Sequence, residues 1–198
     1  MSTKLRQRQA AIGLILISVL LCFSGQAGEE QTVRDLMQAT IDKTIAILRD
    51  PDLKGDAKRD ERREKVRTTL LAVTDARRVS LLTLGRQRNK FSEAQIVQFT
   101  EAFSELVFST YITHLEKYSD EKVKILSVEM RADDKAYAAT MIISSKAETP
   151  ADFSFFKDEK GAWKVYDLTI EGVSIVSNYR TQFTELMLKM TPDELIAH

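Results

Sequence analysis

Between residues 32 and 118, apolar positions repeat at helical spacing. Val33, Met37 and Ile41 open the first stripe, with Thr32 at its capping position, Asp35 three residues later, and Asp50-Pro51 as its end. A run of mixed charge from 56 to 67 continues into a second apolar stripe and reads as the solvated face of a helix. Two further helices are predicted, over 75–84, where Gly85 stops the first, and from Ser92 to about Tyr118.

The long helix predicted from Ser92 has an apolar arc wider than a half-buried surface helix requires. Phe99, Phe103 and Val107 lie on one face, and Tyr111 continues that face by one turn. Phe108 lies to one side of the stripe. We therefore expect this helix to be covered on two sides, by protein or by a ligand.

The pattern then changes to the period of strands. Runs at 123–131, 135–145, 150–157 and 162–170 alternate, with polar turns at 132–134 and 158–161. Gly172 breaks the last strand, and a helix capped by Ser174 or Ser177 follows until Pro192. Helices, then four antiparallel strands, then a helix predict an α+β fold with a twisted sheet. The space between helices and sheet is either closed core or an apolar pocket, which periodicity does not distinguish.

The first residues have the layout of a secretory signal peptide. Lys4, Arg6 and Arg8 precede an apolar run over 10–23, and Gly25-Gln26-Ala27 forms a small-x-small cleavage site. We place the cut after Ala27, so that residues 1–27 are the signal peptide and 28–198 a single domain. The alternatives are an uncleaved anchor and a lipoprotein. The mature chain carries 29 − 3 = 26 basic and 29 acidic residues, and we expect it in the periplasm.

Composition narrows the chemistry further. A chain with 29 basic and 29 acidic residues is not a dedicated nucleic-acid binder. One cysteine and two histidines disfavour a metal centre, and no phosphate loop or nucleophile elbow is present. His114 lies on the apolar face of the long helix, where it is either a half-buried side chain or a base. We therefore expect no cofactor, no metal and no catalytic residue.

Charged residues cluster at the corner between the last strand and the last helix. Asp167 and Arg180 are expected to form an ion pair that clamps this corner, and Glu171 precedes a helix N-terminus, where negative charge is favoured. A catalytic pair of carboxylates is the alternative. Trp163 is expected to pack at a sheet edge, with ligand binding as the alternative.

This corner resembles the MlaC family, also known as the toluene-tolerance type. The resemblance is carried by WKVYD at 163–167, IEGVS at 170–174 and NYR-x-QF at 178–183, with Leu84-Gly85-Arg86 upstream. It covers nearly all of the mature chain. One departure is that Gln87-Arg88 stand where the family often has an aromatic pair, so that the aromatic packing or partner contact made at that place in the family is not expected here.

The resemblance implies a periplasmic protein that carries glycerophospholipid between an outer-membrane lipoprotein–porin complex and an inner-membrane ABC transporter, maintaining outer-membrane lipid asymmetry. We expect a monomer whose pocket between helices and sheet holds the acyl chains. The side chains expected to line that pocket are Phe99, Phe103, Val107, Tyr111, Ile142, Val165, Val173, Tyr179, Phe183 and Met187. The alternatives are a carrier of another lipid such as a hopanoid, a periplasmic adaptor with a closed core, and an enzyme acting on a small hydrophobic substrate.

Overall fold

The structure is a computed structural model that describes residues 27–116, 122–145 and 147–198. The predicted signal peptide lies outside these residues, except for Ala27 at its end. The helical segments are, in order, a helix over 27–49, η1 Pro51–Leu53, η2 Asp56–Lys58, α2 Arg59–Ala72, α3 Ala76–Leu84, η3 Gly85–Lys90, α4 Glu93–Glu116, α5 Ile175–Leu186 and α6 Pro192–Ala197. The strands are β1 Lys122–Ala132, β2 Lys135–Ile143, β3 Glu148–Lys157, β4 Trp163–Ile170 and β5 Val173–Ser174.

Short polar side chains set the starts of three helices as the sequence predicts. The Asp75 carboxylate accepts from the backbone N–H of Arg78 and caps α3, which ends at Gly85 with a φ of 56°. Ser92 and Gln95 exchange side-chain and backbone hydrogen bonds at the start of α4. The Ser174 hydroxyl accepts from the Ser177 N–H and caps α5, which decides between the two predicted caps.

Two predicted boundaries are wrong. Thr32 does not cap the first helix, because the helix already includes residue 27 and the Thr32 hydroxyl donates to the Gly28 carbonyl within it. Pro192 does not end the last long helix: α5 stops at Leu186, and Pro192 is the first residue of α6. Proline is favoured at the first position of a helix because a backbone N–H there would have no partner within the helix, so its absence costs nothing. The loop expected over 51–55 contains the turn η1, which Asp50 caps.

The strands form one antiparallel sheet in the order β1-β2-β3-β4-β5. The fifth strand, which the sequence did not predict, has two residues and pairs with the end of β4. The turn between β4 and β5 is Glu171-Gly172, with φ values of 49° and 81°, as a two-residue hairpin turn requires. Thr74, in the link between α2 and α3, makes an isolated parallel bridge to Val165 on β4. The predicted α+β class is confirmed.

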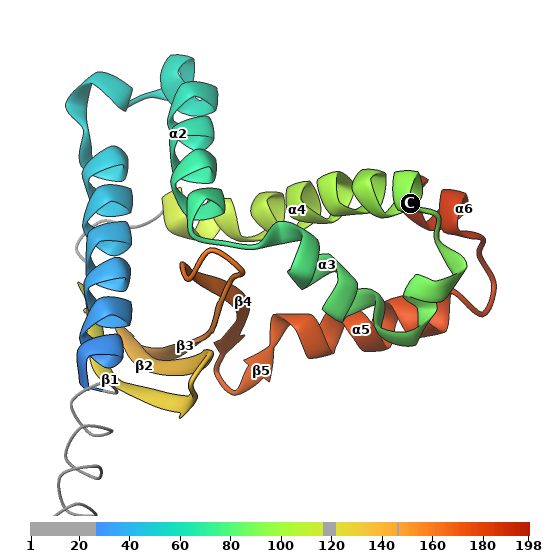
Figure 1. Cartoon of the computed structure of the whole chain (residues 1–198). Helices are drawn as coiled ribbons and strands as arrows, with labels where there is room; N and C mark the ends of the chain where they lie inside the picture. Colours follow the sequence, from blue (N-terminus) through green and yellow to red (C-terminus); the bar gives the residue numbers. More distant parts are fainter. Residues whose placement is uncertain (1–26, 117–121, 146) are drawn as a thin grey trace, which may run out of the picture.

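Two groups of helices lie at opposite ends of the molecule (Figure 1). The helix over 27–49 runs up from the sheet, and the chain returns along α2 after the two short turns. Helices α3, α4, α5 and α6 form the second group, in which α3 packs on both α4 and α5. Each group has its own apolar cluster, described below, and β4 joins them through its packing on α3 and α5.

Candidate functional site

The aromatic side chains predicted to line a pocket form a closed cluster between α4 and α5. Phe99 and Phe103 are each 3% exposed and stack with ring centroids 5.6 Å apart. Phe183 meets both rings edge-on, at 5.3 Å from Phe99 and 5.5 Å from Phe103, which is the favoured arrangement for aromatic pairs. Met187 is buried in the same cluster. These side chains are buried in one cluster with further apolar residues, Leu84, Phe91, Ile96 and Leu195.

Half-buried side chains lie at the edge of that cluster. Val107 packs against it, and the Tyr179 ring lies 5.1 Å from Phe103 and 5.7 Å from Phe183. Tyr111 is also half-buried, and removal from water raises the pKa of its phenol, with a smaller contribution from Tyr179. The α4 face is therefore closed near its start and more open toward its end.

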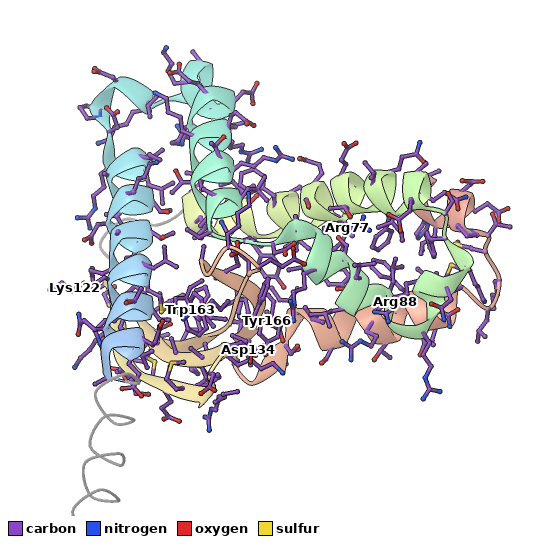
Figure 2. All side chains as sticks on the ribbon, in the orientation of Figure 1. Arg77, Arg88, Lys122, Asp134, Trp163 and Tyr166 are labelled. Atoms are coloured by element: carbon purple, nitrogen blue, oxygen red, sulfur yellow. The ribbon has the colours of Figure 1, made fainter. Side chains whose placement is uncertain are left out.

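The sheet has a second apolar cluster on one face, which we call the inner face because the helix over 27–49 covers it. Val33 and Met37 of that helix are buried against small side chains of β2 and large ones of β3 and β4. The sheet members of the cluster are Val128, Ala136, Ala138, Phe155 and Trp163. Trp163, labelled in Figure 2, is 5% exposed and donates its ring N–H to Glu29 at 2.8 Å, so it is a core residue here.

Ile142 and Val165 belong to the same inner face but lie outside the closed part of the cluster. Ile142 is four residues beyond Ala138 on β2, so alternation places it on that face, and Val165 pairs with Phe155 across β3 and β4. Both are half-buried. Val173, the remaining predicted lining residue, is 57% exposed in β5. The structure therefore divides the ten predicted residues among the closed helical cluster, its half-buried edge, the inner face of the sheet and an exposed corner.

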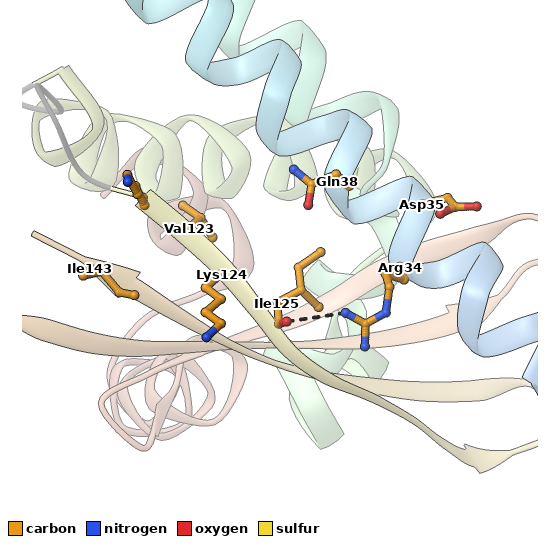
Figure 3. A pocket seen from close by; sticks show the side chains of 8 residues that line it. Arg34, Asp35, Gln38, Val123, Lys124, Ile125 and Ile143 are labelled. Carbon is orange, nitrogen blue, oxygen red and sulfur yellow. Dashed lines mark hydrogen bonds between the residues drawn. The ribbon is translucent and has the colours of Figure 1, made fainter.

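A hollow of about 470 Å³ opens beside the inner face, between the helix over 27–49 and β1 (Figure 3). Arg34 lines it and donates to the Ile125 carbonyl at 3.4 Å, and Val123 lines it opposite Ile142 in the β1–β2 register. The hollow is thus open space at the Ile142 end of the inner face. Its residues are Arg34, Asp35, Gln38, Lys122–Ile125 and Ile143.

The predicted ion pair between Asp167 and Arg180 is wrong. The Asp167 carboxylate instead accepts from the Ser174 hydroxyl at 2.5 Å and from the Val176 N–H at 3.1 Å, at the start of α5. Arg180 donates from Nε to the Leu82 carbonyl at 2.7 Å, near the end of α3. Each charge thus meets the helix terminus that complements it, because these backbone groups lie closer than the other side chain.

A cluster that the sequence analysis missed ties α2 to the end of α4. The Glu116 carboxylate accepts from Arg63 at 2.7 and 3.1 Å and from Arg62 at 2.9 Å, and Arg62 also donates to the Leu53 carbonyl. Hydrogen bonds from Arg63 and, to a smaller extent, from Arg62 hold the pKa of Glu116 below its usual value despite desolvation. The charged run over 56–67 was the sequence signal for these ion pairs. Their partner, Glu116, is 53 or 54 residues away along the chain and could not be identified from the sequence.

Other chemistry is sparse within the described ranges. No group of three or more His, Cys, Asp or Glu side chains is placed to hold a metal ion there. No helix in the same residues is both long and apolar enough to cross a membrane. The His114 side chain, the one interior candidate base, lies outside what the structure describes.

Comparison with known proteins identifies relatives. The family model described as "MlaC protein" matches residues 38–198. The intermembrane phospholipid transport system binding protein MlaC of Haemophilus influenzae is 27% identical over 166 residues, which cover 81% of this chain and 77% of the relative.

A solved structure has the same fold. It is the phospholipid-binding protein of Ralstonia solanacearum in complex with a phospholipid, and it superposes with a TM-score of 0.73 at 23% identity. The match covers 82% of this chain and 92% of that one. Its likeness to this chain is one of fold.

Proposed function

Because this chain belongs to the MlaC family, we propose that it binds phospholipid and carries it across the periplasm as a non-catalytic shuttle. The family match over residues 38–198 is the observation that carries this proposal, since it includes the helical apolar cluster, the sheet members of the second cluster and the corner between β4 and α5. The H. influenzae relative, named as a phospholipid transport binding protein, supports the same function. The shared fold with a phospholipid-binding protein is consistent with it.

The physical need for such a carrier is large. Two acyl chains of roughly 15 CH₂ groups, at about 0.8 kcal/mol each, represent about 24 kcal/mol of transfer cost into water. An apolar surface has to offset most of that cost during transit. The protein offers two surfaces that are apolar but incompletely covered by its own residues, at the end of α4 and on the inner face of the sheet.

We infer that the acyl chains lie against these half-buried residues. Val107 and Tyr111 of α4 and Tyr179 of α5 form one side, and Ile142 and Val165 of the inner face form the other. The hollow beside Ile142 provides open space at that end. Phe99, Phe103, Phe183 and Met187 form the packed wall behind the helical side, and Val173 borders the site at the corner.

The rest of the assignment is also proposed by family membership. Residues 1–27 would be a signal peptide removed after Ala27, leaving a single periplasmic domain over 28–198. The partners would be an outer-membrane lipoprotein–porin complex and an inner-membrane ABC transporter, with this chain as a monomer between them. No nucleic acid and no cofactor enters this function.

A matched pair of variants on α4 tests the lipid site. Val107→Asp places a charge at the half-buried edge, whereas Val97→Asp makes the same change where the side chain is 51% exposed. After export and purification without detergent, extracted phosphate per protein is measured. We expect wild-type lipid content for Val97→Asp and strong loss for Val107→Asp, since an unpaired charge is costly in an apolar site.

The melting temperature of both variants, measured without lipid, shows whether the fold persists. A folded Val107→Asp protein with undiminished phospholipid contradicts the proposed site. A wild-type protein without phospholipid contradicts the function itself and favours an adaptor with a closed core, and a bound hopanoid favours the other carrier.

A further inference from the structure

A second hollow, of about 660 Å³, lies between the end of α3, η3 and α5. It has no lining residue in common with the proposed lipid site, although α5 contributes to both, with Tyr179 at the lipid site and Arg180 and Thr184 at this hollow. We call it the basic hollow. Its lining residues are Leu81, Leu82, Gly85, Arg86, Gln87, Arg88, Asn89, Arg180 and Thr184.

The charges of the basic hollow are all of one sign. It contains three arginines and no carboxylate. Arg86 and Arg88, both exposed, have no ion pair or side-chain hydrogen bond within the described residues, whereas Arg62, Arg63 and Arg77 are each paired with a glutamate. Figure 2 labels Arg88 on the η3 turn. The whole chain has equal numbers of acidic and basic residues. The positive charge of the basic hollow is therefore a local feature and does not follow from the net charge of the protein.

One guanidinium of the cluster is held in place by the fold. Arg180 donates from Nε to the Leu82 carbonyl, and a Cβ on Gly85 would lie 3.3 Å from the Arg180 Cδ. Gly85 has a φ of 56°, so both its backbone and its close neighbour favour glycine. The terminal nitrogens of Arg180 have no hydrogen-bond acceptor among the described residues. The rest of this side chain is already held in place by the contacts of Nε and Cδ.

An exposed apolar side chain, Leu188, lies in the turns that follow α5. Leu188 follows Arg180 by eight residues and Thr184 by four, in the turns that continue α5, which places all three on one side. Leu188 is 77% exposed. Lys90 reaches the same end of α5, with its Nζ 3.5 Å from the Met187 carbonyl.

We propose that the basic hollow is a docking surface for an acidic segment of a partner protein, with an apolar side chain of that segment packing on Leu188. Arginine forks bind carboxylates through paired hydrogen bonds, and three such groups around one concavity match a string of acidic side chains. A concave site receives a protruding segment better than it receives the flat surface of a membrane. The proposal is independent of lipid binding, because none of these residues belongs to the proposed lipid site.

The test uses a fluorescein-labelled peptide of twelve residues, eleven glutamates and one leucine, with a glutamine version as its neutral control. Binding to the purified protein is followed by anisotropy at rising salt. We expect binding of the acidic peptide that weakens with salt, since exposed charges are screened. Arg86→Glu with Arg88→Glu is expected to weaken it by at least about tenfold.

The matched control is Lys43→Glu with Lys135→Glu, which makes the same change in net charge at exposed positions elsewhere. We expect it to change binding by less than about twofold. Both double variants should keep the wild-type melting temperature and phospholipid content. Equal losses in the two variants, or no binding by the wild type, overturn the proposal. A third outcome also overturns the proposal: the wild type binds phosphatidylglycerol vesicles but not the peptide, and the double arginine variant no longer binds the vesicles. That result would assign the surface to a membrane.

Discussion

Replacing Phe103 by alanine tests whether this side chain belongs to a closely packed wall or to a surface that contacts lipid. Phe103 is 3% exposed and contacts three rings, at 5.6 Å from Phe99, 5.1 Å from Tyr179 and 5.5 Å from Phe183. Removing a buried phenylalanine costs about 3–5 kcal/mol through lost transfer free energy and the cavity left behind. At about 2–4 °C per kcal/mol for a chain of this size, the melting temperature should fall by roughly 6–20 °C.

The measurement is thermal unfolding of delipidated protein, because bound lipid would add its own stabilisation. A double-mutant cycle with Phe183→Ala should give a coupling of about 0.5–1.5 kcal/mol, as expected for rings in contact. Phe108→Ala, at a half-buried position of α4, should cost less. A loss below about 1 kcal/mol for Phe103→Ala, or no coupling to Phe183, would refute the closed packing described above.

Three further changes test other parts of the structure. Gly172→Val should lower the melting temperature by forcing a β-branched side chain to a φ of 81°, at about 1–2 kcal/mol, and an unchanged melt refutes the role of the turn. Ser174→Ala should cost about 0.5–2 kcal/mol of unfolding free energy through loss of the α5 cap, whereas Thr181→Ala on the same helix should cost less; equal urea midpoints contradict this. Glu116→Gln should destabilise the protein at pH 7, and the loss should become smaller as the pH falls below the usual carboxyl pKa. The pKa of Glu116 is lowered on folding, so its stabilisation is present above the usual carboxyl pKa of 4.5 and is lost as the pH falls through the folded value; a pH-independent loss argues against the ion pairs.

The elements that the sequence predicted correctly are those set by local chemistry. The cap at Asp75, the stop at Gly85 and the turn over 158–161 depend on residues a few positions apart. Pro192 was misread for a local reason too, since the Thr191 to Glu194 spacing of a capping box was present in the sequence. Thr32 is not the cap because the helix already includes residues 27–31, upstream of the predicted capping position.

Partners far apart in the chain were not predictable in the same way. Asp167 and Arg180 were correctly predicted to lie at one corner, but Asp167 accepts from the Ser174 hydroxyl and the Val176 N–H, and Arg180 donates to the distant Leu82 carbonyl. Periodicity placed Phe103 and Val107 on one face of α4, yet one is closed in the core and the other lies at its edge. That difference depends on the rings of α5, Tyr179 and Phe183, that pack on Phe103, which no spacing in α4 encodes.

Native mass spectrometry of residues 28–198, exported to a bacterial periplasm and purified without detergent, tests the central claim most directly. A phospholipid carrier predicts discrete added masses that match phospholipids, with the same lipids in an organic extract. The size of the added mass gives the number of lipid molecules bound and, from the lipid's identity, the number of acyl chains. A bare protein mass together with an extract free of lipid would contradict the account.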